Sequence, residues 1–173
     1  MRTFVWLISL KSLDADARAI HLGEAARMEL AAGQDEFVGD PLRMMLVSLE
    51  EESRFPYIVE SNGKAVGVMT LQSGAATLAG WPDDRDAWLL RGFLISRQHQ
   101  GHGLGTLAAV AAVREAAKLS SRLGAGEAGV VLSVSESNPA GLAAYRKAGF
   151  QDRGLYVGGG SGPQRTMYRA FSS

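Results

Sequence analysis

The segment from Gln100 to Thr106 has the residue types that bind phosphate groups. It follows an apolar run, Trp88 to Ile95, and precedes Leu107 to Leu123, which is apolar at first and then amphipathic. A strand, a turn and a helix are therefore predicted in succession. The first turn of a helix has backbone N–H groups without internal partners, and glycine lets an anion approach them closely. A phosphate or pyrophosphate is the predicted ligand. The segment reads Gln100, Gly101, His102, Gly103, Leu104, Gly105, Thr106.

Two common nucleotide motifs do not fit this segment. A P-loop needs Gly-Lys-Ser or Gly-Lys-Thr after the glycines, and the chain has neither there. The dinucleotide fingerprint would place its third glycine at Ala108. A tight connection between strand and helix, without a ligand, is the alternative interpretation.

The segment resembles motif A of the GNAT superfamily of N-acetyltransferases, Gln/Arg-x-x-Gly-x-Gly/Ala. Gln100, Gly103 and Gly105 stand at the motif positions, and Gly101 is where the family often has glycine. The apolar run before it, Trp88 to Ile95, is where that family has its fourth strand.

A second segment resembles motif B of the same superfamily, Asn-x-x-Ala/Gly-x-x-x-Tyr-x-x-x-Gly-Phe. One helix and one strand are predicted between the two motifs, as in the family. Two motifs in order are much stronger than either alone. The resemblance covers Tyr57 to Phe171 well and the amino-terminal helices loosely. The matching residues of motif B are Asn138, Gly141, Tyr145, Gly149 and Phe150.

The resemblance implies an α/β fold with a mixed, mostly antiparallel central sheet. About six to seven strands and about four helices are expected, with the sheet splayed between strands four and five. Residues 1–173 are predicted to form a single acetyltransferase domain, in which 1–56 supply the first strand and two helices on the substrate side. Local patterns agree: a strand at 4–10, a helix at 13–31, a helix start at Asp40-Pro41 and a hairpin turn at Asn62-Gly63.

Composition is that of a globular protein, with 46% hydrophobic and 21% charged residues. No apolar run approaches the roughly 20 residues of a membrane span, and the amino terminus does not read as a signal peptide. Without cysteine, disulfides, thiolate metal sites and a cysteine nucleophile are excluded. His21, His99 and His102 have no metal-ligand spacing, and no basic stripe interleaved with aromatics indicates nucleic acid. A cytoplasmic protein is expected.

Charge is unevenly distributed, although the net charge is zero. From Asp14 to Glu60 there are eleven Asp or Glu and four Arg or Lys, a local net charge of minus seven. From Arg91 to Arg122 there are five Arg or Lys and one Glu, a local net charge of plus four. One interpretation is a basic end for an anionic cofactor beside an acidic end for a cationic substrate. The alternative is two solvated faces that happen to differ.

Acetyl transfer to an amine requires a polarised thioester carbonyl and a proton for the departing thiolate. By the resemblance, the backbone groups of Phe93, Leu94 and Ile95 pair with the pantetheine arm of acetyl-CoA and polarise the carbonyl. The amides of the Gln100–Thr106 turn hold the pyrophosphate, and Asn138 contacts the pantetheine as well as capping its helix.

Tyr145 is the predicted proton donor, because the motif B tyrosine faces the cofactor sulfur in this family. A phenol with a pKa of about 10 is a plausible acid toward a thiolate of comparable basicity. The general base is left open. Many relatives have a glutamate on the fourth strand, where this chain has Arg91. Asp35, Glu36, Glu136 and ordered water are the alternatives.

The function implied is an acetyl-CoA-dependent N-acetyltransferase that transfers acetyl directly to a primary amine. The segments 34–38 and 88–101 are similar to those of bacterial diamine and spermidine acetyltransferases, and the acidic amino-terminal half agrees with a polyamine. Asp35, Glu36 and Arg91 are therefore the predicted substrate contacts. An antibiotic amine, an amino acid and a protein amino terminus stay open, as does an idle acyl-CoA-binding regulatory module. A homodimer is one expectation, since relatives are often dimers.

Overall fold

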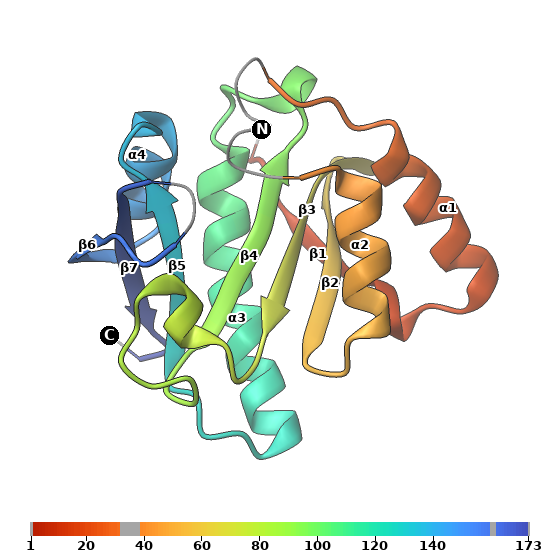
Figure 1. Cartoon of the computed structure of the whole chain (residues 1–173). Coiled ribbons are helices and arrows are strands. Elements are labelled where there is room, and N and C mark those ends of the chain that lie inside the picture. The colour runs from red at the N-terminus through yellow and green to blue at the C-terminus, as the bar shows by residue number, and fades with distance from the viewer. Residues whose placement is uncertain (1, 32–38, 160–161, 173) are drawn as a thin grey trace.

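The computed structural model describes residues 2–31, 39–159 and 162–172. Seven strands of this part form one sheet in the order β1-β2-β3-β4-β5-β7-β6 (Figure 1). Neighbouring strands are antiparallel except β4 and β5, which are parallel. The predicted mixed, mostly antiparallel sheet is thus confirmed. The strands are β1 (Trp6–Ser9), β2 (Arg54–Ser61), β3 (Lys64–Gln72), β4 (Trp88–Ile95), β5 (Gly129–Ser135), β6 (Gln151–Tyr156) and β7 (Gln164–Ala170).

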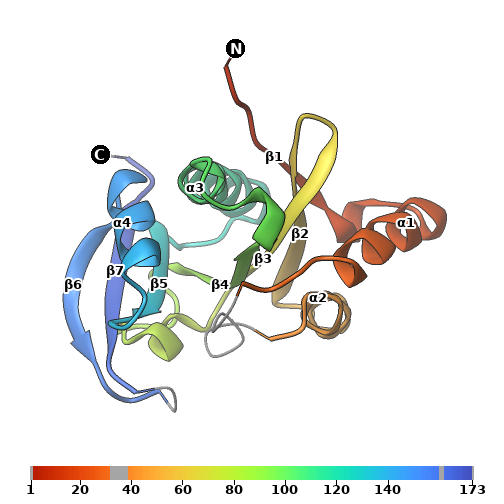
Figure 2. The same ribbon diagram turned by 90° about the horizontal axis from the view of Figure 1, so that it is seen from above.

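Helices cover both faces of the sheet. Figure 2 shows α3 and α4 on one face and α2 on the other, with α1 beside it. The described α-helices are α1 (Ala15–Ala26), α2 (Pro41–Glu50), α3 (Leu104–Leu123) and α4 (Pro139–Lys147), with short 3-10 turns at Leu10–Ser12, Ala76–Ala79 and Arg97–His99.

The α2 helix begins where the sequence predicts. The Asp40 carboxylate accepts a hydrogen bond from the Arg43 amide at 3.0 Å, and Pro41 occupies the first turn, where its missing N–H costs nothing. The hairpin at Asn62-Gly63 is also confirmed, because both residues have positive φ values, 52° and 74°, and join β2 to β3.

The first helix is shorter than predicted, since α1 ends at Ala26 rather than at residue 31. Beyond it, the chain is held by the end of β4. The Glu29 amide donates to the Ser96 hydroxyl at 3.2 Å, and the Glu29 carbonyl accepts from the Arg97 amide at 2.8 Å. These bonds to the segment that follows β4 take the place of the helical bonds that the backbone of Glu29 would otherwise make.

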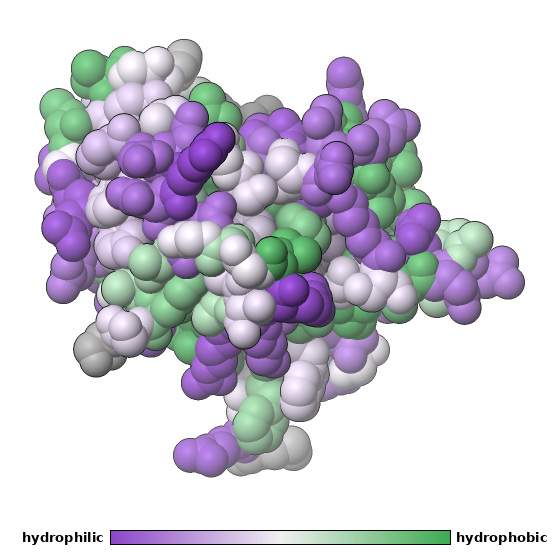
Figure 3. Space-filling view, turned by 90° about the horizontal axis from the view of Figure 1, so that it is seen from below, coloured by the Kyte–Doolittle hydropathy of each residue, from purple (hydrophilic) through white to green (hydrophobic). Residues whose placement is uncertain are grey.

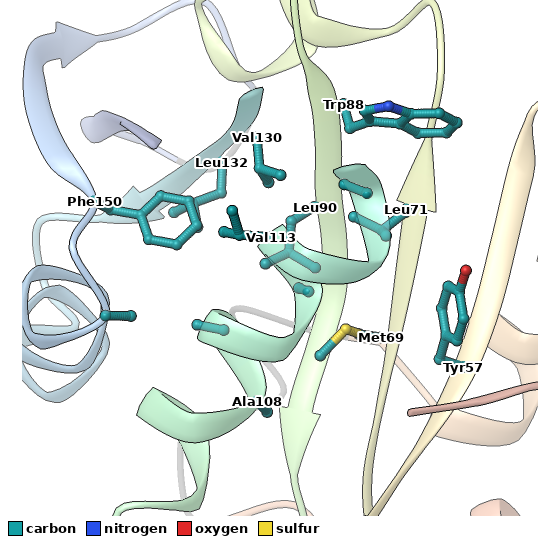
Figure 4. Close-up of a cluster of buried hydrophobic side chains, with 14 of the residues drawn as sticks. Tyr57, Met69, Leu71, Trp88, Leu90, Ala108, Val113, Val130, Leu132 and Phe150 are labelled. Carbon is teal, nitrogen blue, oxygen red and sulfur yellow. The ribbon is translucent and has the colours of Figure 1, made fainter. Parts of the chain in front are cut away.

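The main core lies between the sheet and α3 (Figure 4). Trp88 is fully buried there and forms a T-shaped aromatic pair with Phe55, with ring centroids 5.7 Å apart. Its indole N–H donates to the Ser120 hydroxyl of α3 at 2.7 Å, which satisfies a buried polar group. A second cluster packs α1 and α2 on the opposite face. It contains Leu10, Ala25, Met45, Ile58, Val68 and Leu94.

Among the described residues, no helix has both the length and the apolar character needed to cross a membrane. On the face seen from below, hydrophobic residues occur in small patches between hydrophilic ones (Figure 3).

The buried indole of Trp88 gives a stability prediction. Trp88→Phe keeps an aromatic ring but removes the hydrogen bond to Ser120, so we expect the free energy of unfolding to fall by about 1–3 kcal/mol. Urea denaturation measures this change. Trp6→Phe is the matched control, because Trp6 is 64% exposed, and it should change stability by less than about 0.5 kcal/mol. Equal effects of the two substitutions would contradict this role of Trp88.

Candidate active site

β4 carries a bulge that changes which face its side chains occupy. Its register with β3 passes from Thr70↔Arg91 to Val68↔Leu94, so two β4 residues lie opposite one β3 residue. Gly92, inside the bulge, has φ +57°, a conformation that glycine adopts without strain. As a result, Leu90 and Phe93 both contact the α3 core, although they are three residues apart.

β4 and β5 pair only at Trp88↔Val130 and Leu89↔Val131. Beyond these positions the two strands separate, as Figure 1 shows toward its top. β5 remains fully paired with β7, from Gly129↔Ala170 to Ser135↔Gln164. The predicted splay between strands four and five is therefore confirmed, and it exposes a length of β4 backbone edge.

Two cavities meet in this opening. The strand cavity, of about 400 Å³, lies between β4 and β5. The turn cavity, of about 700 Å³, lies between the Gln100–Thr106 turn and α4. Phe93, Asn138 and Tyr145 line both cavities, so the structure brings together three predicted site residues from three separate segments.

The glycine-rich turn has the backbone form needed for an anion site. Gly101 and Gly103 have positive φ values of 81° and 78°, and Gly103 caps α3 without a side-chain oxygen. In the described part of the chain, the amides of Leu104, Gly105 and Thr106 find no acceptor. These free amides and the helix dipole suit a phosphate.

Other predicted residues of this region have different surroundings. The Gln100 side-chain amide donates to the Ile95 carbonyl at 2.8 Å, which ties the turn to the end of β4. His102 is exposed and does not line either cavity. The Leu94 side chain is buried under α1 and α2, so only its backbone could face a ligand.

The start of α4 places Asn138 at the junction of the cavities. Its side-chain oxygen accepts from the Gly141 amide at 3.0 Å, so the predicted cap is present. A Cβ at Gly141 would lie 2.6 Å from the Asn138 side-chain nitrogen, which explains the glycine.

Tyr145 lies one turn after Gly141, and its ring packs between two others. The centroid distances are 6.1 Å to Phe93 and 5.9 Å to Phe150. Burial raises the pKa of the Tyr145 hydroxyl above its ordinary value, so the group is protonated at neutral pH. Its hydroxyl makes no hydrogen bond to any residue that the structure describes, and it is free to bond a ligand.

Among the described residues that line the strand cavity, Arg91 has the one charged side chain. Thr70, which lies opposite it on β3, shares a 3.1 Å hydrogen bond with Ser48 of α2, so Arg91 is on the α2 face of the sheet. The Arg91 guanidinium donates to the Gln72 side-chain oxygen at 2.8 Å. Burial lowers the pKa of Arg91, and the positive charge of Arg54 lowers it further.

Of the candidate bases, the one residue that the structure describes does not line either cavity. Glu136 is exposed and lies 3.4 Å from Arg165, which also pairs with Asp152. Asp35 and Glu36 lie outside the described residues. Within the described ranges, no carboxylate lines either cavity, and His99 lines only the turn cavity.

Several of the described acidic residues between Asp14 and Glu60 have structural roles instead. Asp14 and Asp40 cap α1 and α2, and Glu29 pairs with Arg97 at 3.0 Å. The local charge of minus seven therefore does not place a described carboxylate in the strand cavity.

Sequence reasoning missed Gln72, which orients Arg91, and Gln164, which lines the strand cavity. No motif marks these residues. Only the strand register brings them to the opening.

Residues 23–150 match the family model described as the acetyltransferase (GNAT) family. The chain belongs to this family. The GNAT assignment explains the splayed sheet and the turn before α3 together.

Solved structures share the fold. The aminoglycoside acetyltransferase AAC(6')-Ib, in complex with coenzyme A and kanamycin, aligns with a TM-score of 0.69 and 21% identity over 98% of this chain and 95% of that chain. The spermidine N-acetyltransferase from Vibrio cholerae, in complex with CoA and spermine, has a TM-score of 0.65 and 16% identity over 97% and 96%. No curated protein sequence gives a significant match.

The turn cavity gives a binding prediction. Gly105 is helical, and the nearest atom to a Cβ built there is Ile95 Cγ1 at 4.0 Å, so Gly105→Leu puts bulk into the cavity without backbone strain. We expect the affinity for coenzyme A to fall by about tenfold or more, roughly 1.4 kcal/mol, in titration calorimetry. The control is Gly126→Leu, at the other end of α3, where a Cβ meets nothing within 4 Å. If the Gly105 variant binds coenzyme A with unchanged affinity, the prediction that coenzyme A binds in this cavity is wrong.

Proposed function

We propose that this chain is a single-domain N-acetyltransferase that transfers acetyl from acetyl-CoA directly to the primary amine of a small molecule. The observation that carries the proposal is the meeting of the two cavities at Phe93, Asn138 and Tyr145. One cavity offers free helix-start amides for a pyrophosphate, and the other can admit an acceptor.

The residues fit acetyl-CoA along the whole turn cavity. The amides of Leu104, Gly105 and Thr106 are suited to the pyrophosphate. The open edge of β4 near Phe93 offers unpaired backbone groups to the pantetheine arm, with Asn138 opposite. Both coenzyme A complexes named above belong to proteins of the same fold, which supports this assignment.

Acetyl-CoA supplies an activated acyl group as a thioester. In the transfer, the carbon–sulfur bond breaks as the carbon–nitrogen bond of the amide forms. Tyr145 gives its proton to the departing sulfur, and backbone N–H groups at the open edge of β4 polarise the carbonyl. We take water, one of the alternatives for the base, as the group that accepts the proton of the amine, and a proton from water restores the Tyr145 hydroxyl; within the described ranges no carboxylate lines the strand cavity. The absence of cysteine agrees with direct transfer.

A diamine or polyamine is one candidate acceptor. The acidic balance of the amino-terminal half supports it, as does the fold shared with the spermidine N-acetyltransferase. The charge in the strand cavity does not support it, because Arg91 would repel a second ammonium group. A panel of amines with thiol release from acetyl-CoA tests the activity itself. Coenzyme A binding without any release would favour a regulatory acyl-CoA-binding module.

The role of Tyr145 is tested by Tyr145→Phe, which keeps the ring between Phe93 and Phe150 and removes the hydroxyl. Loss of a general acid lowers the rate by roughly 10²–10⁴-fold, so kcat should fall by that order while acetyl-CoA affinity barely moves. Phe150→Leu is a control for ring packing, because it removes a neighbouring ring and leaves the hydroxyl. If Tyr145→Phe turns over like the unaltered protein when chemistry limits the rate, another donor acts.

The pH dependence of kcat/KM should be set by the pKa of the acceptor amine. With water as the base, kcat/KM should rise with pH and level off near the pKa of the amine. Burial raises the pKa of Tyr145, so its proton stays in place and no alkaline decline is expected below about pH 10. Two acceptors whose amines differ by about two pKa units should give inflections separated by a similar amount. A shared inflection would indicate a base on the protein.

A further inference from the structure

The Arg91 guanidinium is held in place by a hydrogen bond but has no acidic partner among the described residues. One of its terminal nitrogens donates to Gln72, whose own side-chain amide donates to the Ser53 hydroxyl at 3.4 Å. Gln72 is therefore oriented by one partner and orients Arg91 in turn. A guanidinium has five N–H donors, so the remaining donors of Arg91 are available on the cavity side.

The surroundings of Arg91 make an anionic partner favourable. Among the described residues, Arg91 forms no ion pair, and the charged group that acts on it most strongly is the like charge of Arg54. Arg54 adds an Nε–H that is buried without an acceptor in the part of the chain that the structure describes. A half-buried cation beside a second cation is costly unless an anion binds it.

The rest of the strand cavity limits the size and chemistry of that anion. The cavity of about 400 Å³ has Leu78 and Leu89 among its apolar residues and hydroxyls from Ser133 and Ser135. The same cavity extends to Phe93 and Tyr145, where the acceptor amine must lie under the proposed function. An acceptor in this space can bind Arg91 and place its amine near Phe93 and Tyr145 at the same time only if it carries an anionic group as well as the amine.

We propose that the acceptor is an amine that also carries a carboxylate, such as an amino acid, and that Arg91 binds the carboxylate. Arginine suits this role because its planar fork binds a carboxylate through two parallel hydrogen bonds. The proposal rests on the acetyltransferase function and assigns its substrate class. A purely cationic acceptor would require an acidic residue in the cavity. Arg91 provides a positive charge there instead, which suits an acceptor with a carboxylate.

The test compares each amino acid with its own amide, which keeps the amine and removes the negative charge. Glycine, β-alanine and longer ω-amino acids are each paired with the corresponding amide, and spermidine is included. Thiol release gives kcat/KM, expressed per concentration of free amine so that differences in the protonated fraction do not enter, and the acid-to-amide ratio of each variant is compared with that of the unaltered protein, which cancels the remaining difference in nucleophilicity. For at least one chain length, we expect the acid to exceed its amide by roughly ten- to hundredfold.

Two substitutions should abolish this preference by different routes. Arg91→Gln removes the cation, and the ratio of acid to amide should approach one. Gln72→Glu keeps Arg91 and nearly the same shape, but places a carboxylate at the 2.8 Å hydrogen bond, where it competes with the substrate. Arg114→Gln is the matched control, because Arg114 is exposed on α3, on the opposite face of the sheet, and it should keep the ratio. Retained coenzyme A binding shows that each variant is folded.

Three results would overturn the proposal. If amides or spermidine are acetylated as well as every acid, the carboxylate assignment fails and the acetyltransferase function stands. If acids are preferred but both Arg91→Gln and Gln72→Glu keep the preference, the carboxylate binds elsewhere. If coenzyme A binds and no amine in the panel releases thiol, the proposed function fails as well.

Discussion

The site depends on how β5 divides its pairing between its two neighbours. It forms a full ladder with β7 but meets β4 at only two positions, while β4 is held on its other edge by β3. β5 therefore keeps its ladder with β7, and β4 stays paired with β3 on both sides of its bulge, so the sheet opens between β4 and β5 without leaving either strand unsupported. The exposed edge of β4 has N–H and C=O groups that water or a ligand must satisfy. Both cavities begin at this edge.

The bulge at Gly92 gives the opening two different sides. It sends Arg91 to the α2 face and Phe93 to the α3 face, although two residues separated by one position would share a face in a regular strand. Phe93 then packs near Tyr145, and Arg91 is held by Gln72. Two aromatic side chains and a cation without a described counter-ion thus line one cavity. The acceptor proposed above, an amine that also carries an anionic group, rests on this combination.

Charge counted along the sequence differs from charge in the site. The acidic amino-terminal half suggested a field for a cationic substrate, but Asp14 and Asp40 cap helices and Glu29 pairs with Arg97. A carboxylate that bonds helix-start amides or an arginine is engaged locally and contributes little at a distance. Glu136 shows the same effect, because it lies 3.4 Å from Arg165 and does not line either cavity.

The sequence by itself determined the features that depend on residues close together in the chain. The glycine turn before α3, the Asn138 cap with Gly141, the Asn62-Gly63 hairpin and the start of α2 follow from local backbone preference, and the two motifs indicated the family and the splayed sheet. Tertiary structure decided where β4 and β5 part, that α1 stops at Ala26, and that Gln72 orients Arg91. These depend on strand register and on bonds between residues far apart in sequence. A one-residue bulge changes the face of every later side chain, and no local pattern records where it occurs.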